Sequence, residues 1–140
     1  MKRSPELTPL SHDHHHGLFT AMKLKRATDD TAADARDAFT TYWEAEGRRH
    51  FAIEEDLLLP AFARHVPADH EGIVRVLVEH VDLRRRAQDL ETITALHELG
   101  ERLQAHIRHE ENVLFPQIES TLPHDELAAL GAEIAAAEGR

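Results

Sequence analysis

One pattern that occurs twice sets the strongest constraint on how this chain of 140 residues folds. Residues 50–60 read HFAIEEDLLLP, and residues 106–116 read HIRHEENVLFP. His, two consecutive Glu, Leu and Pro recur at the same offsets, 56 residues apart. A His and a Glu four residues apart lie one turn apart on the same face of an α-helix. The repeat therefore predicts two equivalent helices, each with an imidazole and a carboxylate on one face.

The rest of the sequence also favours helices. Gly and Pro number only six each, and Ala, Leu, Glu and Arg, which are good helix formers, are abundant. No segment shows the alternation of apolar and polar residues that marks a strand. The periodicity predicts four long helices at about 10–28, 31–65, 70–89 and 91–121, and a short fifth at about 124–138. Because the connections are short, we expect an all-α fold: an antiparallel, up-down-up-down four-helix bundle with a short C-terminal fifth helix.

Length and charge narrow the function classes. We expect one domain over residues 1–140, with the bundle at about 10–122. Sixteen Lys and Arg against 26 Asp and Glu give a net charge of −10, which disfavours nucleic-acid binding. No apolar run approaches the roughly 20 residues of a membrane helix, so no membrane partner is expected. Residues 1–10 lack the apolar core of a secretory signal, so we expect a cytoplasmic protein.

The apolar stripes of the predicted helices contain polar residues that ought to be costly to bury. The stripe at 31–65 includes Trp43 and Leu57, and the stripe at 91–121 includes Leu103 and Val113. Six candidate ligands fall on the inward stripes: His15, His50, Glu54, His80, His106 and Glu110. Positions that should deliver Leu or Val to the core therefore deliver four His and two Glu.

The first helix offers a choice, because its start contains four His around Asp13. His15 and Leu18 match His80 and Leu83 as His-x-x-Leu, and this favours His15 as the inward residue. His14, one position round the helix, is the alternative.

Simpler interpretations exist for each feature taken alone. A single His on an apolar stripe is more often a hydrogen-bonded core residue than a ligand. The run at 54–56 is typical of a solvated acidic face, and Pro60 and Pro116 are typical of helix ends. Taken together, however, buried carboxylates need a compensating charge, and an unpaired one costs several kcal/mol. A metal ion binds carboxylates and neutral imidazoles at once. We therefore predict two metal ions, each with two His, bridged by the two Glu.

The order His15, His50-x-x-x-Glu54, His80, His106-x-x-x-Glu110 resembles the hemerythrin-like, or HHE cation-binding, domain family. The motifs DHHHGLF, HFAIEEDLLLP, EHVDL and HIRHEENVLFP carry this resemblance over about residues 10–122. It implies an antiparallel four-helix bundle with a non-haem di-iron centre. The four His would be terminal ligands, and Glu54 and Glu110 would bridge two Fe ions, with an oxo or hydroxo bridge completing the centre. Iron rests on the resemblance, because the same ligand types also accept Mn or Zn.

The sequence departs from the oxygen-carrying hemerythrins at two places. Val76 stands where those proteins carry a second His, one turn before the third-helix His. His106 is followed by Glu110 and Glu111, where they have His-x-x-x-x-Asp. One His fewer leaves coordination positions open, which favours a centre that binds or senses O₂ or nitric oxide over simple O₂ storage.

Two further hypotheses belong to other classes. The first is a di-iron enzyme that consumes peroxide, O₂ or nitric oxide, with Glu111 or a spare first-helix His as acid–base partner. The second is a bundle that holds iron for storage or stability without turnover. The expected partner is a small diatomic ligand or peroxide in the first two cases. The absence of Cys disfavours the iron–sulfur repair branch of the wider family, and it excludes disulfides and thiolate ligands.

Overall fold

The computed structural model describes residues 2–139, and all of their secondary structure is helical. In chain order the segments are α1 (Thr8–Lys25), α2 (Ala32–Tyr42), η1 (Trp43–Gly47), α3 (Arg48–Ile53), η2 (Glu54–Leu58), α4 (Leu59–Phe62), α5 (Glu71–Arg86), α6 (Ile93–His109), η3 (Glu110–Leu114), α7 (Phe115–Thr121) and α8 (His124–Glu138), where η marks a π-helical turn. Segments α2 to α4 follow one another without a break, as do α6 to α7. Across residues 2–139, no helix combines the length and apolar character needed to cross a bilayer.

Local sequence signals account for several helix starts. Pro9 lies in the first turn of α1, where a missing N–H costs nothing. The Thr92 hydroxyl accepts a hydrogen bond of 3.0 Å from the Ala95 N–H and so caps α6. The His70 ring accepts a bond of the same length from the Gly72 N–H at the start of α5.

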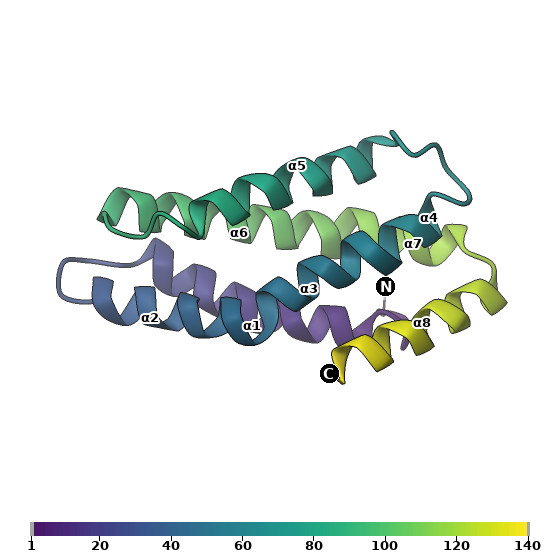
Figure 1. Cartoon of the computed structure of the whole chain (residues 1–140), viewed down its shortest axis with the longest axis horizontal. Coiled ribbons are helices and arrows are strands. Elements are labelled where there is room, and N and C mark those ends of the chain that lie inside the picture. Colours follow the sequence, from purple (N-terminus) through teal and green to yellow (C-terminus); the bar gives the residue numbers. More distant parts are fainter. Residues whose placement is uncertain (1, 140) are drawn as a thin grey trace.

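The helices pack side by side as a bundle, and α8 lies against α1, α3 and η2 (Figure 1). The apolar core has two parts. One contains Leu58, Phe62 and Leu130, at the end where α4, α7 and α8 meet. The other contains Phe39 and Leu99, at the end formed by α2 and the start of α6. On each long helix the buried His and Glu residues therefore lie where the first cluster gives way to the second.

Small residues let α1 and α6 approach closely. A Cβ on Gly17 would lie 2.7 Å from Ile107 Cδ1, and a Cβ on Gly100 would lie 2.8 Å from the Ala21 carbonyl oxygen. Packing therefore requires glycine at position 100, where the neighbouring atom is backbone, whereas a Cβ at position 17 would have to displace the ends of two side chains. The buried face of α1 consequently runs through Leu10, His14, Gly17, Ala21 and Leu24.

Two π-helical turns occur at equivalent places in the repeat. The Leu59 N–H bonds to the Glu54 carbonyl in η2, and the Phe115 N–H bonds to the Glu110 carbonyl in η3. In each case the next residue is a proline, Pro60 or Pro116, which has no N–H to continue the α-helical ladder. The prolines therefore do not end the helices; a π turn precedes each one and the helix continues.

The π turns also change which residues face inward. A π turn uses i→i+5 bonds and holds about one residue more than an α turn. The inward face moves on by one residue, so Leu58 and Leu114 are fully buried. Val113, which the α-helical stripe predicted to be inward, is 44% exposed, and Leu57 is only half-buried. The predicted stripe is therefore wrong by one position after each Glu.

Candidate metal centre

Six buried residues, one each from α1, α3, η2, α5, α6 and η3, meet in the polar middle of the bundle, and each is between 0 and 2% exposed. They are His14, His50, Glu54, His80, His106 and Glu110. They form two groups whose potential ligand atoms all lie within 4.8 Å of one another. One group contains His14 and His50, the other contains His80 and His106, and both contain Glu54 and Glu110.

The structure corrects one predicted position. His15 is exposed on α1, and His14 lies in the cluster in its place. The His-x-x-Leu match followed the large apolar side chains, but Leu18 is only half-buried. The face of α1 that packs against α6 is defined by Gly17 and Ala21. The other five predicted residues lie together in the cluster.

Glu54 and Glu110 lie between the two pairs of His, and each carboxylate has one oxygen facing each pair. Glu54 Oε2 lies 2.9 Å from His50 Nε2, and Glu54 Oε1 lies 2.9 Å from His80 Nε2. Glu110 Oε1 lies 2.9 Å from His14 Nε2, and Glu110 Oε2 lies 3.4 Å from His106 Nε2. Both carboxylates therefore have the orientation of a bridge between two cations.

The outward-facing nitrogen of every central His contacts a second carboxylate. The Nδ1 pairs are His14 with Glu111 (2.6 Å), His50 with Asp13 (3.0 Å), His80 with Glu55 (2.7 Å) and His106 with Glu79 (2.7 Å). Because an ionised carboxylate only accepts hydrogen bonds, each Nδ1 carries a hydrogen and donates it. The Nε2 of each ring is thereby directed at the centre, the arrangement that orients metal-ligating histidines.

These outer carboxylates are themselves held by cations or hydroxyls. The Arg84 guanidinium lies 2.6 Å from Glu55, and the Arg75 guanidinium lies 3.0 Å from Glu79. The Ser11 hydroxyl donates to Glu111 at 2.7 Å. Ring stacking adds to this, because Phe51 lies face to face with His80 at 3.8 Å between centroids. These contacts therefore hold the outer carboxylates in place, and the carboxylates in turn fix the orientation of the imidazole rings.

Asp13 differs from the other outer carboxylates because a second carboxyl, Glu138 at the end of α8, lies beside it. Burial, together with the neighbouring Asp13, raises the pKa of Glu138 to about 7. Glu138 therefore keeps its proton to a higher pH than an ordinary carboxyl does, and it places the end of α8 beside the partner of His50.

Opposite charges control the pKa values within the centre. Burial by itself would raise the pKa of Glu110, but the facing His106, His14 and His50 lower it well below its usual value. Burial by itself would lower the pKa of His50, but Glu54 and Asp13 raise it well above its usual value. The pKa values of His14 and His106 are also raised by carboxylates against the effect of burial. Protons thus hold the positive charge that a cation would otherwise supply.

The donor atoms fit two metal ions. Although the facing nitrogen and oxygen atoms lie as close as 2.9 Å, six buried atoms of the centre form no hydrogen bond of suitable geometry: His50 Nε2, His80 Nε2, His106 Nε2, Glu54 Oε1, Glu54 Oε2 and Glu110 Oε2. Buried polar atoms without partners are rare in folded proteins and require an explanation. All six point into the shared space, and imidazole nitrogen with carboxylate oxygen is a ligand set for iron, manganese or zinc. Two cations would satisfy every one of these atoms.

Sequence reasoning missed the outer carboxylates, although the sequence contains a signal for them. An acid precedes the inward His on two helices, as Asp13-His14 and Glu79-His80. An acid follows the central Glu on the other two, as Glu54-Glu55 and Glu110-Glu111. Matching acid–His pairs would have aligned His14, not His15, with His80. Glu111 also has a defined place, because it binds His14 Nδ1 and Ser11.

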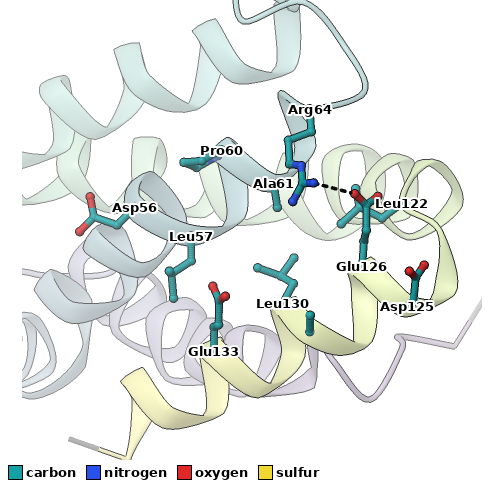
Figure 2. Close-up of a pocket in the computed structure, with 11 residues that line it drawn as sticks. Asp56, Leu57, Pro60, Ala61, Arg64, Leu122, Asp125, Glu126, Leu130 and Glu133 are labelled. Atoms are coloured by element: carbon teal, nitrogen blue, oxygen red, sulfur yellow. Dashed lines mark ion pairs between the residues drawn. The ribbon is translucent and has the colours of Figure 1, made fainter.

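A pocket of about 360 Å³ lies apart from the centre, between α4 and α8 (Figure 2). Leu57 and Leu130 line it together with Asp56 and Glu133, and Arg64 pairs with Glu126 across it at 3.4 Å. None of the six central residues lines this pocket.

The comparisons with known proteins agree with this geometry. A family model described as the hemerythrin HHE cation-binding domain matches residues 8–118. Searches of curated proteins and of solved structures gave no match. The matched stretch contains the six central residues and the four outer carboxylates, and it ends before α8.

Proposed function

Because the chain belongs to the family of hemerythrin HHE cation-binding domains, we propose that its centre holds two iron ions and binds or senses O₂ or nitric oxide. One observation carries the proposal: two pairs of His share two carboxylates, each with one oxygen toward either pair. His14 and His50 would hold one ion, and His80 and His106 the other. The proposal includes the up-down-up-down, antiparallel order of the four long helices, which their short connections support.

The small number of metal-ligating atoms that the chain offers to each ion favours the binding of an external ligand such as O₂ or nitric oxide. Each ion would receive two imidazole nitrogens and two carboxylate oxygens from the chain. Val76, which is fully buried, lies on α5 one turn before His80, where the oxygen-carrying hemerythrins have a further His. When bound, iron supplies open coordination positions for O₂ or nitric oxide and the electrons that such ligands accept.

The chain's own residues would fix the geometry around those positions. The four outer carboxylates hold the Nδ1 hydrogens and so leave Nε2 free for the ion. The apolar clusters on either side of the centre exclude water from it. Iron is proposed over manganese and zinc from the resemblance to hemerythrins, since the donor atoms suit all three.

The experiment that tests this proposal follows the spectrum of the iron-loaded, reduced protein without a tag. Addition of O₂, and separately of nitric oxide, should produce new absorption bands in the visible and near-ultraviolet range. The double variant Glu54→Ala and Glu110→Ala should give no such bands, whereas Glu44→Ala, at an exposed site on η1, should behave like the wild type. An iron-loaded protein whose spectrum changes with neither gas would contradict the proposal.

A further inference from the structure

Helix α5 has an apolar face that nothing in the described chain covers. Residues 2–139 contain six exposed large apolar side chains, and four of them lie on α5. They are Val74 (43% exposed), Leu77 (42%), Val78 (62%) and Val81 (68%). Their spacing of three and four residues places them on one stripe. A helix at the surface of a bundle normally presents polar residues there, so this stripe indicates a contact with another molecule.

The packing of the bundle does not account for the stripe, because α5 packs against the rest of the chain through its opposite face. Ile73, Val76, His80 and Leu83 are buried against the rest of the chain. Helix α5 lies along one edge of the bundle (Figure 1), so its outer face is free to meet a partner.

Charges at the two ends of the stripe identify the partner. Glu71 lies seven residues before Val78, and Arg85 lies seven residues after it. Seven residues make about two turns, so all three side chains lie along one line of the helix. Glu71 makes no ion pair within residues 2–139, and the Arg85 side chain is 66% exposed with only a 3.5 Å contact to Asp82. Along this line an acidic residue, an apolar residue and a basic residue therefore follow one another, and the two opposite charges are equidistant from Val78.

We propose that two copies of this chain pair through α5, antiparallel, about a two-fold axis at Val78. In this arrangement Glu71 of one copy meets Arg85 of the other, and the two-fold symmetry makes this contact twice. Val74 of each copy lies near Val81 of the other, so the apolar stripes cover each other. A parallel pairing would instead place Glu71 against Glu71 and Arg85 against Arg85.

The neighbouring charges leave this pairing undisturbed. Arg75 is paired with Glu79, and Arg84 is paired with Glu55. Both flanks of the stripe are therefore neutralised within the chain, and the ends of the stripe are left for the second copy. An anionic membrane surface would instead favour cations at both ends of the stripe, and Glu71 does not fit that pattern.

The first test measures the mass of the full chain by light scattering or sedimentation over a range of concentrations. We expect a two-chain particle. Val78→Asp should weaken the pairing by about 100-fold or more, because it buries an unpaired charge at the axis. The matched control is Phe19→Asp, which places the same charge at another exposed apolar site, on α1, 57% exposed, and should leave the mass unchanged. A wild-type chain that stays single at every concentration, or a pairing that Val78→Asp leaves intact, would overturn the proposal.

A charge exchange tests the antiparallel arrangement itself. Glu71→Arg alone and Arg85→Glu alone should each weaken the pairing by about 10-fold, because each places like charges together at two contacts. The double variant should return to within about three-fold of the wild type, because both contacts are restored with their signs exchanged. All these positions are exposed, so circular dichroism should show an unchanged fold. Failure of the double variant to recover would exclude the antiparallel pairing.

Discussion

The chemistry of each central imidazole depends on its two nitrogens facing different surroundings. Nδ1 of every central His donates to an outer carboxylate, and Nε2 points to Glu54 or Glu110. A flip of a ring about its Cβ–Cγ bond would put Cδ2 in the place of Nδ1 and Cε1 in the place of Nε2, which would leave the outer acid without a donor and turn Nε2 away from the centre. The stacking of Phe51 on His80 and the ion pair of Arg84 with Glu55 oppose such a flip at one of the four sites.

The identity of the first-helix ligand gives the first prediction at this scale. His14→Ala should lower the number of bound metal ions from two per chain to about one, because only one of the two groups contains His14. His15→Ala should keep both ions, because His15 is exposed and outside the cluster. Metal analysis after exhaustive dialysis measures the ratio. Loss of an ion from the His15 variant alone would reverse the assignment.

The outer carboxylates give the second prediction. Glu79→Gln keeps the size of the side chain but removes the charge that faces His106 Nδ1. Metal affinity should fall by about 10- to 100-fold, as is typical when the partner of a metal-bound His is changed. Competition with a chelator measures the affinity. Glu44→Gln is the control, since that side chain is 59% exposed and, among residues 2–139, forms an ion pair with Arg48 alone. Equal losses in both variants would argue against an orienting role.

At the scale of helices, much of the structure follows from the sequence. The repeat at 50–60 and 106–116 predicted two equivalent helices, and both the central Glu and the following π turn occur at equivalent positions. Helical periodicity could not predict the one-residue shift after each Glu, because it assumes 3.6 residues per turn throughout. Val113 therefore fell on the wrong face.

The error at His15 has a different physical origin. Hydrophobicity locates a buried face by its large apolar side chains, but the α1–α6 contact is built on Gly17, Ala21 and Gly100. Small residues mark close backbone approach and score weakly on any hydrophobic scale. The outer carboxylates were missed because their partners are on other helices, and distances between helices are not visible in a single sequence.

The close approach of α1 and α6 gives a prediction at this scale. Gly100→Ala should lower the free energy of unfolding by about 1–3 kcal/mol, because the new Cβ would lie 2.8 Å from the Ala21 backbone oxygen. This loss should exceed the roughly 1 kcal/mol that Ala gains over Gly in a helix. Gly17→Ala should cost less, because its nearest neighbours are the ends of the Ile107 and Tyr42 side chains. Denaturant unfolding measures both, and a stabilised Gly100 variant would contradict the packing.

At the scale of the whole molecule, the centre buries the carboxylates of Glu54 and Glu110 in a chain that is already acidic, with a net charge of −10. In the metal-free protein, protonated His balances the buried carboxylates. Metal binding must displace these protons, so the affinity for metal should rise with pH.

The stability of the metal-free fold should change with pH in the opposite direction to the metal affinity, and should fall as the pH rises above 6.5. The raised pKa values of His14, His50 and His106 stabilise the fold fully below their usual value of 6.5, and this stabilisation is lost as the pH rises through the raised values. Burial would raise the pKa of Glu111, but His14 and Ser11 lower it to about 2 from 4.5. That contribution is present above pH 4.5 and is lost as the pH falls toward 2.

The free energy of unfolding of the metal-free protein should therefore be greatest between about pH 4.5 and 6.5. It should fall by about 1–3 kcal/mol on moving from pH 5.5 to pH 8.5, and again on moving to pH 3. Urea unfolding at the three pH values measures the change. A metal-free protein that becomes steadily more stable up to pH 8.5 would contradict the assigned charges.

In the proposed centre Glu54 and Glu110 would bridge two ions, and the metal-to-chain ratio tests this arrangement most directly. Elemental analysis of the protein loaded with ferrous iron under anaerobic conditions and then dialysed should give two iron ions per chain. The double variant Glu54→Ala and Glu110→Ala should give none, because both groups contain both carboxylates. A wild-type ratio of one or zero, or two ions retained by the double variant, would contradict the account.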